Sequence, residues 1–385
     1  MVAKFHFRLY NHGTMLAVTH FLNDGPVPPQ SQTEPMNEDN SSKFEKREIH
    51  MPKKAADTAK SKTLRMLEEN RGQIVSGEKL AMGIGVSRAA IWKAIESLRK
   101  EGYPITASTN KGYILAEDSD LLSAQGMRPF INEDRYPYVE KNIHAYKILE
   151  STNKTAKQKV FEGAPNGTVI LAEEQTHGRG RLGRSFFSPA GKGLYMSFVI
   201  RPDFDTSKSL LVTAAASVAV CRAIKKVCRM ETHIKWVNDI LFEGRKICGI
   251  LTEAITNFES GQIDAVIIGI GVNCSMNNED MPEEIRDTAG SLSGVVSRNR
   301  LAAEIINELT NILDNFTEGP YPEYMDEYRR RSIVLRKNIK VYKNITSDEF
   351  LNAKAVDISD DGGLLVIYDD GRKDTLTTGE ISIRL

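Results

Sequence analysis

Residues 175–201 read QTHGRGRLGRSFFSPAGKGLYMSFVIR, and the part from 178 to 184 has a composition that no buried core element has. Seven consecutive positions, Gly178 to Arg184, hold three glycines and three arginines. Glycine permits positive φ and lets the backbone approach a ligand, while guanidinium groups bind carboxylate or phosphate oxygens with paired hydrogen bonds. β-rich runs on both sides, Thr168–Gln175 and Gly193–Ile200, indicate that the loop joins two strands. The stretch therefore predicts a binding loop for an anionic small molecule.

Two other interpretations of this loop have to be weighed. It matches G-x-G-x-x-G, the dinucleotide-binding pattern, but that pattern requires a helix directly after the glycines. Here Ser188-Pro189-Ala190-Gly191 and a second strand follow, which disfavours a dinucleotide site. A solvated basic hairpin loop is the other alternative, because runs of charge usually lie on the surface. The loop by itself leaves this alternative open.

Composition limits the classes of protein to which this chain can belong. The 385 residues suffice for two or three domains, with 41% hydrophobic and 26% charged residues and a formal net charge of zero. Four widely spaced cysteines without Cys-x-x-Cys spacing indicate a reducing compartment and argue against a zinc site. No apolar run approaches the ~18 residues of a membrane span. We expect a cytoplasmic protein that does not bind a membrane.

Residues 1–57 are rich in Pro, Asn, Ser, Gln and charge and show no helical or strand period. Such a segment cannot bury enough apolar surface to offset the entropy of ordering, so we expect a disordered N-terminal extension. Met36 and Met51 are alternative candidates for the start of the protein.

Residues 58–120 predict a winged helix-turn-helix. Leu64 and Leu67 suggest a first helix, and Ser76 can cap a short second one. A third, capped by Ser87, reads SRAAIWKAIESLRKEG and stops at Gly102. The following Ile105–Leu115, with its Asn110-Lys111-Gly112 turn signal, predicts the wing hairpin.

The third helix of such a motif enters the major groove of DNA. Its stripe of Ile91, Ile95 and Leu98 would face inward, and the candidate DNA-binding residues are Ser87, Arg88 and Lys93. Between Thr58 and Ala116, ten Lys and Arg against five Asp and Glu leave an excess of five positive charges. A small helical protein-interaction module remains the alternative, since a fold does not fix a function.

Three further parts follow. Residues 121–142 are expected to be a linker. Residues 143–330 alternate strand-like with helical runs, which favours an α/β domain whose sheet is covered by helices. The predicted strands are 168–174, 194–200, 247–253 and 265–272, and the predicted helices are 152–162, 209–230 and 300–316. Residues 331–385 carry short β runs separated by Asp/Gly turns, typical of a small β-barrel that needs the main domain for support.

Three more stretches of the middle domain are polar, although an ordinary α/β core would be apolar at such positions. Ser151-Thr152-Asn153 stands at a strand-to-helix junction, where simple N-capping is the alternative. Lys235-Trp236-Val237-Asn238-Asp239 is either functional or a surface loop. Lys246 opens an apolar strand, and an edge lysine that prevents aggregation is its alternative. Gly269 and Gly271 would let a ligand approach the strand that leads to Asn273.

Taken in order, these motifs resemble the biotin protein ligases. The pattern is STN, then Q-x-x-GRGRxGR-x-x-FSP-x-G, KW-x-ND, GRK-x-x-GI and G-x-GVN. With the helix-turn-helix and a C-terminal GEISIR segment, the similarity is to bifunctional biotin ligases that also repress biotin genes. It covers about Thr58 to Leu385, and GRGRLGR is the biotin-type rather than the lipoate-type loop.

The resemblance implies an α/β (α+β) catalytic domain of the class II synthetase-like biotin/lipoate ligase type. A winged helix-turn-helix would precede it and a small SH3-like β-barrel would follow. It also implies formation of biotinyl-5′-AMP from biotin and ATP, followed by transfer of biotin to a lysine of a biotin carboxyl carrier protein of acetyl-CoA or pyruvate carboxylase. Mg²⁺ would be held mostly by the nucleotide phosphates. Operator DNA and a homodimer formed with bound biotinyl-AMP are the other implied partners.

The resemblance assigns roles to matching residues. The implied biotin-binding residues are Ser151, Thr152, Asn153, Gln175, Arg179, Gly180, Arg181 and Lys246. The implied catalytic residues are Arg181, Lys246 and Asp239, and the implied nucleotide-binding residues are Arg184, Phe186, Trp236, Asn238 and Asn273.

The sequence departs from the family pattern twice. Phe186 stands where many relatives have a Trp that stacks on adenine, and Val237 replaces the usual Pro of KWPND. Three functions stay open: a ligase that is also a repressor, a ligase whose helix-turn-helix does not bind DNA, and a repressor without catalysis.

Overall fold

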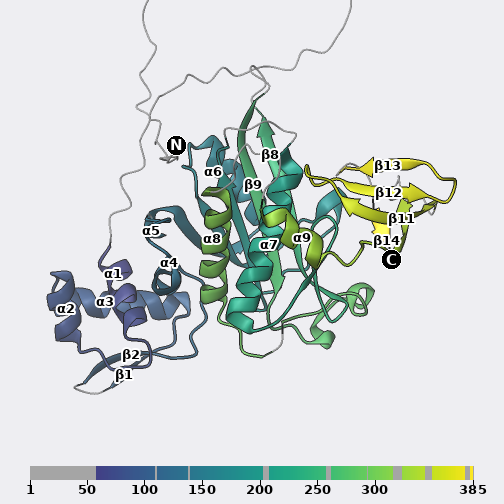
Figure 1. Cartoon of the computed structure of the whole chain (residues 1–385). Coiled ribbons are helices and arrows are strands. Elements are labelled where there is room, and N and C mark those ends of the chain that lie inside the picture. Colours follow the sequence, from purple (N-terminus) through teal and green to yellow (C-terminus); the bar gives the residue numbers. More distant parts are fainter. Residues whose placement is uncertain are drawn as a thin grey trace, which may run out of the picture. The chain divides into compact units, whose positions relative to one another are not determined.

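The computed structural model describes residues 58–108, 111–137, 139–202, 208–256, 262–292, 294–314, 323–342, 349–377 and 382–384. The expected disorder of residues 1–57 and the turn residue Asn110 lie outside these ranges. Residues 57–385 form one compact unit. In Figure 1 the described chain runs from purple helices through a teal and green central sheet to yellow strands.

The N-terminal part is the predicted winged helix-turn-helix, and its helix ends are set by local chemistry. The helices are α1 (Ala59–Glu69), α2 (Gly77–Ile84) and α3 (Arg88–Glu101). The side chains of Thr58, Ser76 and Ser87 each accept a hydrogen bond from a backbone N–H of the first turn. The wing pairs β1 (Ile105–Ser108) with β2 (Gly112–Leu115) in antiparallel register. These predictions are confirmed.

The predicted linker is built into the core. It carries α4 (Ala124–Met127), η1 (Arg128–Phe130) and α5 (Val139–Asn142), and buries Leu122 and Met127 in the main hydrophobic cluster. The buried Arg298 anchors its start: the guanidinium donates to Asp120 at 2.6 Å and to Glu173 at 2.8 Å. Glu173 also accepts from the backbone N–H of Leu122 at 2.7 Å. Because the buried Arg298 and Glu173 are paired and hydrogen-bonded, the burial of their charges is tolerable.

The middle part is built on a seven-stranded sheet with the order β3-β4-β5-β9-β8-β7-β6. Only β3 and β4 are parallel, and the other neighbours are antiparallel. The strands are β3 (Ile143–Leu149), β4 (Val169–Gln175), β5 (Gly193–Ile200), β6 (His233–Lys235), β7 (Asp239–Phe242), β8 (Arg245–Thr256) and β9 (Ile263–Asn273). The four strands predicted here are confirmed, whereas β3, β6 and β7 were not predicted as strands.

Helices cover both faces of this sheet. α7 (Ser209–Cys228) and α8 (Arg298–Asp314) bury one face, which carries the even-numbered residues Val266 to Val272 of β9. α6 (Thr152–Phe161) packs on the other face against Ala265 and Ile267. Alternation along a strand therefore places Gly269 and Gly271 on the α6 face, beyond the end of its apolar cluster. Short η4 (Asn278–Asp280) and η5 (Glu283–Ile285) follow β9.

The C-terminal part is a five-stranded antiparallel sheet with the order β13-β12-β11-β10-β14. Its strands are β10 (Asn338–Tyr342), β11 (Leu351–Ile358), β12 (Leu364–Tyr368), β13 (Lys373–Leu376) and β14 (Ser382–Arg384). α9 (Tyr324–Arg331) precedes it and packs on α7. The buried Ile339, Ala355 and Val366 belong to the main cluster, so this sheet shares its core with the middle part, as its small size requires.

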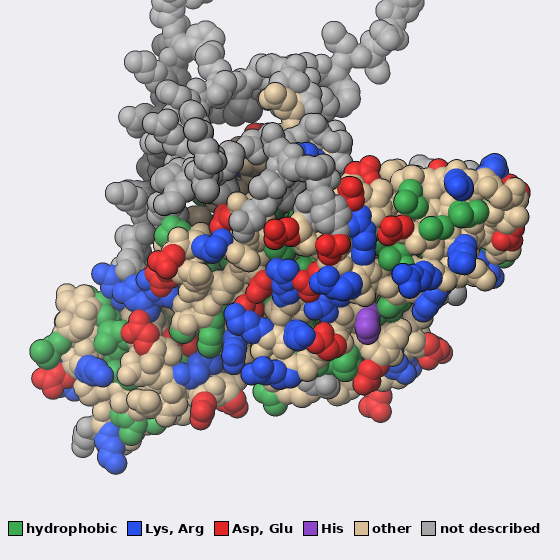
Figure 2. Space-filling view, in the orientation of Figure 1, with side chains coloured by type: hydrophobic (Ala, Val, Ile, Leu, Met, Phe, Trp, Pro, Cys, Tyr) green, Lys and Arg blue, Asp and Glu red, His purple; other side chains and the backbone are tan. Residues whose placement is uncertain are grey.

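Charges are mixed over the surface. Figure 2 shows Lys and Arg side chains interspersed with Asp and Glu across the visible face, in line with a net charge of zero. In the part of the chain that the structure describes, no helix has the length and apolar character required to cross a bilayer.

Candidate functional site

The glycine and arginine loop folds into a tight hairpin between β4 and β5. Gly180 N–H donates to the carbonyl of Arg184 at 2.7 Å, and Phe186 N–H donates to that of Gly178 at 2.9 Å. A Cβ atom at Gly178 would lie 2.3 Å from the Phe186 carbonyl oxygen, so this position requires glycine. The loop turns through η2 (Arg181–Gly183). Because it enters antiparallel β5 and not a helix, the dinucleotide-binding alternative is excluded.

This hairpin covers a pocket on the α6 face of the sheet. The loop, the start of α6, the segment before β7 and the central strands β8 and β9 all contribute to its wall. The lining residues are Ser151, Thr152, Asn153, Gln175, Arg179, Gly180, Arg181, Leu182, Arg184, Ser185, Phe186, Lys235, Trp236, Asn238, Asp239, Lys246, Gly249, Ile250, Leu251, Gly269, Ile270 and Gly271. All predicted small-molecule site residues except Asn273 are among them.

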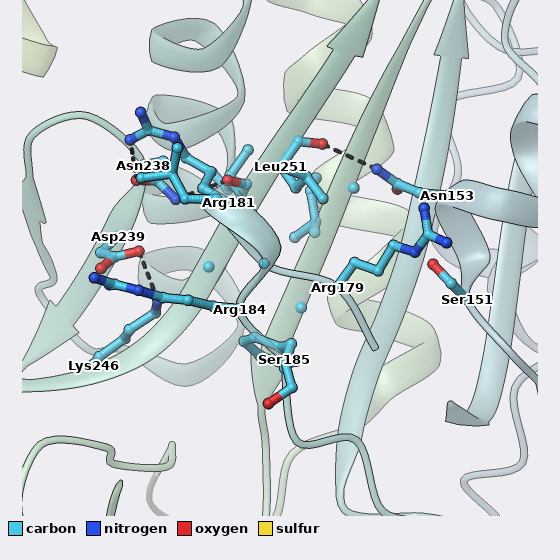
Figure 3. Close-up of a pocket in the computed structure, with 18 of the residues that line it drawn as sticks. Ser151, Asn153, Arg179, Arg181, Arg184, Ser185, Asn238, Asp239, Lys246 and Leu251 are labelled. Atoms are coloured by element: carbon cyan, nitrogen blue, oxygen red, sulfur yellow. Dashed lines mark hydrogen bonds and ion pairs between the residues drawn. The ribbon is translucent and has the colours of Figure 1, made fainter. Parts of the chain in front are cut away.

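At one end of the pocket, Gln175 ties β4 to the start of α6. Its side-chain oxygen accepts from the backbone N–H of Thr152 at 2.8 Å and from the Thr152 hydroxyl at 3.1 Å. Its amide nitrogen donates to the hydroxyl of Ser188 at 2.9 Å. Ser151 occupies the N-cap position without a side-chain cap hydrogen bond, which disfavours the simple capping alternative. Figure 3 shows Arg179 extended toward Ser151.

The amide of Asn153 is engaged by protein groups on three sides. It donates to Glu253 at 2.6 Å and to the carbonyl of Leu251 at 3.3 Å, and accepts from the buried hydroxyl of Ser197 at 2.6 Å. A Cβ at Gly269 would lie 2.2 Å from its oxygen. Both of its N–H donors are therefore used, and Asn153 shapes the floor of the pocket. Sequence reasoning missed Glu253, because only the packing of α6 on β8 brings its carboxylate to Asn153.

Two paired glycines make room for the ring of Phe186. Gly249 of β8 and Gly271 of β9 are register partners. A Cβ at Gly271 would come within 2.6 Å of the ring, and one at Gly249 within 3.4 Å of it. The ring also meets Tyr195 edge-on, with centroids 6.4 Å apart. Phe186 thus packs over bare backbone in the wall of the pocket, where an aromatic ring can contact a ligand.

Charged groups gather at the other end of the pocket. The Arg181 guanidinium donates to the side-chain oxygen of Asn238 at 3.2 Å, and Asn238 donates to the carbonyl of Ile250 at 2.9 Å. The ammonium of Lys246 lies 2.7 Å from a carboxylate oxygen of Asp239. In Figure 3, Arg184 points toward this pair, while Arg179 and Arg181 extend in opposite directions. Burial lowers the pKa of Arg181 and the Asp239 carboxylate opposes that effect, so the guanidinium keeps its charge at neutral pH.

Two of the predicted nucleotide-binding residues make hydrogen bonds to other parts of the protein. Trp236 lines the pocket, but its indole N–H donates to the carbonyl of Gly362 in the C-terminal sheet at 3.0 Å. Asn273 lies outside the lining and donates to the carbonyl of Gly290 at 2.8 Å. Residues 288–290 in turn hold the backbone of Lys246 through two hydrogen bonds of 2.8 Å. The Trp236–Val237 peptide bond is cis, and Val237 is buried.

Metal ligands are sparse in this region. Asp239 is the one carboxylate among the described residues that line the pocket, and it is already paired. Within the described ranges no cluster of three His, Cys, Asp or Glu side chains could hold a metal ion.

A second candidate surface is the exposed face of α3. Arg88 and Lys93 are exposed, as predicted, and the described residues include no ion-pair partner for either. The hydroxyl of Ser87 accepts from Ala90 N–H at 3.2 Å and so caps the helix. Sequence reasoning missed Trp92, which is 57% exposed on the same face. Its place directly after Ile91, outside the inward stripe, was the available signal.

Known proteins share this arrangement. The bifunctional ligase/repressor BirA of Bacillus subtilis is 34% identical over 324 residues, which are 82% of this chain and 96% of that protein. This chain belongs to the bifunctional biotin ligase/repressor family. The Escherichia coli protein of the same name is 29% identical over 315 residues, covering 81% of this chain and 94% of its own.

Family models divide this ligase/repressor chain as its fold does. The biotin/lipoate A/B protein ligase family matches residues 145–273, an HTH domain matches 60–114, and the biotin protein ligase C terminal domain matches 344–384. A biotin protein ligase from Aquifex aeolicus, solved in complex with biotin and ATP, superposes with a TM-score of 0.54 at 28% identity and covers 63% of this chain and 99% of its own. The predicted family and fold are confirmed, whereas the domain boundaries and the roles of individual site residues stay predictions.

Proposed function

We propose that this chain is an ATP-dependent biotin protein ligase that also represses biotin genes by binding operator DNA. The observation that carries the proposal is one pocket in which the GRGRLGR hairpin, the STN helix start, KWVND and Lys246 meet, on a chain that also presents a helix-turn-helix. The relatives whose names combine the two activities match both parts.

Biotin would occupy the end of the pocket near α6. Ser151, Thr152 and Gln175 offer hydroxyl and amide groups there, Arg179 and Gly180 close the loop over it, and Asn153 shapes the floor. The carboxylate end of the ligand would then point toward the cations at the opposite end. Phe186, whose ring occupies the space over Gly271, would contact the ligand between these two ends.

In the first reaction the biotin carboxylate attacks the α-phosphorus of ATP and pyrophosphate leaves, which forms biotinyl-5′-AMP. Two anions must come together, so charge neutralisation and orientation supply most of the catalysis. Arg181 and Lys246 are placed for this, with Asp239 orienting Lys246 at 2.7 Å and Asn238 orienting Arg181 at 3.2 Å. Arg184 and Phe186 are the proposed nucleotide contacts. Mg²⁺ would reduce the charge repulsion of the phosphates. The phosphates would supply its ligands, because Asp239 is already paired with Lys246.

In the second reaction the ε-amine of a lysine on the carrier protein attacks the acyl carbon, and AMP leaves. The mixed anhydride hydrolyses readily, so the loop must keep water away until the carrier arrives. Asp239 is the proposed group to assist the incoming amine, because no other carboxylate among the described residues lines the pocket.

The test is ATP–pyrophosphate exchange dependent on biotin, with lipoate in parallel. Exchange with biotin alone supports the ligase. Exchange with lipoate alone contradicts the biotin assignment, and exchange with neither ligand leaves a repressor without catalysis. A ligase without DNA regulation would exchange with biotin yet bind operator and random duplex equally.

Arg181→Gly is expected to release biotinyl-AMP about tenfold to a hundredfold faster, because one charge-assisted contact is lost. The released adenylate would then biotinylate lysines of unrelated proteins. Adenylate dissociation, followed by filter binding of the labelled intermediate, measures the effect. Arg372→Ala, on the C-terminal sheet, is the control that should retain the intermediate normally. An unchanged dissociation rate in Arg181→Gly would place Arg181 outside the site.

Biotinyl-AMP is expected to convert the monomer into a dimer through the edge of the middle sheet. β3 is an edge strand with Ile148 54% exposed, whereas the opposite edge strand β6 is bridged by Ser332. Ordering of the loop by the ligand would complete this surface. Sedimentation with and without biotin and ATP, repeated with operator DNA, checks this. Ile148→Lys should remain monomeric while still forming biotinyl-AMP, and a monomer that binds operator without ligand would refute the scheme.

A further inference from the structure

Trp92 is a large aromatic side chain that the fold leaves without a packing role. It lies in the second turn of α3 and is 57% exposed, while its neighbours Ile91 and Ile95 are fully buried. The described residues include no aromatic or cation partner for its ring. The other tryptophan, Trp236, is 5% exposed and hydrogen-bonded, as a buried indole usually is.

The charges around Trp92 favour a polyanion. Arg88 lies one helical turn before it and Lys93 beside it, and within the described residues neither they nor Lys100 are paired with an acid. The two acidic residues of α3 are neutralised within the domain. Glu96 is paired with Arg99 at 2.7 Å, and Glu101 with Lys60 at 2.7 Å. The face that carries Trp92 is therefore positive and free of uncompensated acid, which complements the phosphates of duplex DNA.

An indole on such a helix has one apolar target in the major groove. The arginine and lysine side chains can bind phosphates or guanine, whereas the C5-methyl group of thymine is the apolar feature of the base edges. Ala89, exposed one turn before Trp92, leaves room for the duplex to approach the ring. We propose that Trp92 reads a thymine methyl group in each half-site. This inference rests on the proposed binding of operator DNA and specifies which base contact gives it selectivity.

The experiment starts with duplexes selected from a randomised pool by the unmodified chain in the presence of biotin and ATP. Each thymine of the selected half-site is then replaced by deoxyuridine, which removes only the methyl group. One replacement per half-site should weaken the unmodified chain about threefold to fivefold, the value of one buried methyl group. Trp92→Ala should bind the thymine duplex more weakly and show no further loss with deoxyuridine. Met82→Ala, which removes a 77% exposed side chain from α2, should keep the full deoxyuridine penalty.

Tryptophan fluorescence supplies a second measurement. Because Trp236 is buried, acrylamide should quench mainly Trp92, and bound duplex should protect it. ATP–pyrophosphate exchange should be unchanged in Trp92→Ala, because the pocket lies outside the helix-turn-helix. Retained, though weaker, binding of the thymine duplex shows that the helix-turn-helix of the variant folds. An unchanged deoxyuridine penalty in Trp92→Ala, or quenching that DNA does not alter, would overturn the base contact alone. If the unmodified chain selects no duplex, the result contradicts both the contact of Trp92 with thymine and the proposed repressor function.

Discussion

Lys246→Ala is expected to slow formation of biotinyl-AMP about a hundredfold to a thousandfold, the usual cost of removing one group that stabilises charge in a transition state. Biotin affinity should fall by less than that, because negative charge on the reacting phosphate grows beyond its ground-state value as the reaction proceeds. The ammonium is positioned for this role by Asp239, while its backbone is held by Thr288 and Gly290. Single-turnover adenylation at saturating biotin, together with calorimetric biotin titration, separates the two effects.

Two further variants refine the role of this residue. Lys246→Arg keeps the charge but changes its geometry, so full recovery of the rate would show that charge alone suffices. Asp239→Asn keeps the size of the partner but removes its charge, and should lower the rate less than Lys246→Ala does. If Lys246→Ala binds biotin poorly yet turns over normally at saturating biotin, Lys246 is a binding residue only.

The double variant Arg88→Ala/Lys93→Ala should lose operator binding by about a hundredfold to a thousandfold while its ligase activity remains unchanged. Each lost contact to a phosphate or base weakens binding, and a dimer loses every contact twice. The exposed positions of these residues outside the helix-turn-helix core imply that folding is unaffected. Equilibrium binding to operator and to random duplex at several salt concentrations measures the loss and the change in salt dependence.

Arg372→Ala/Lys373→Ala is the control, since it also removes one exposed arginine and one exposed lysine, here at the start of β13 in the C-terminal sheet. It should bind operator normally. Should Arg88→Ala/Lys93→Ala do the same, α3 would not be the helix that contacts DNA, and the protein-interaction alternative for this domain would be favoured.

Much of this structure could be predicted from the sequence, because the interactions that fix it join residues close together in the chain. The capping hydroxyls of Ser76 and Ser87 and the left-handed Gly102 define the ends of helices through interactions within a few residues. The spacing of glycine and arginine in residues 178–184 predicted a binding loop, since that composition has no use in a core. The strands β4, β5, β8 and β9 followed from their apolar runs. The motif order then indicated the family, which the comparisons confirm.

Tertiary structure alone determined how these parts meet. Gly249 and Gly271 are 22 positions apart in sequence, and only the register of β8 with β9 places them together beneath Phe186. Only the fold likewise allows the hydrogen bond from Asn153 to Glu253 and the ion pair of Arg298 with Asp120 before the linker. The same is true of the hydrogen bond from the Trp236 indole to the carbonyl of Gly362. These contacts depend on strand pairing and on packing between distant segments. Periodicity and composition describe each segment by itself, so they carry no information about which distant partner completes a hydrogen bond or fills the space above a glycine.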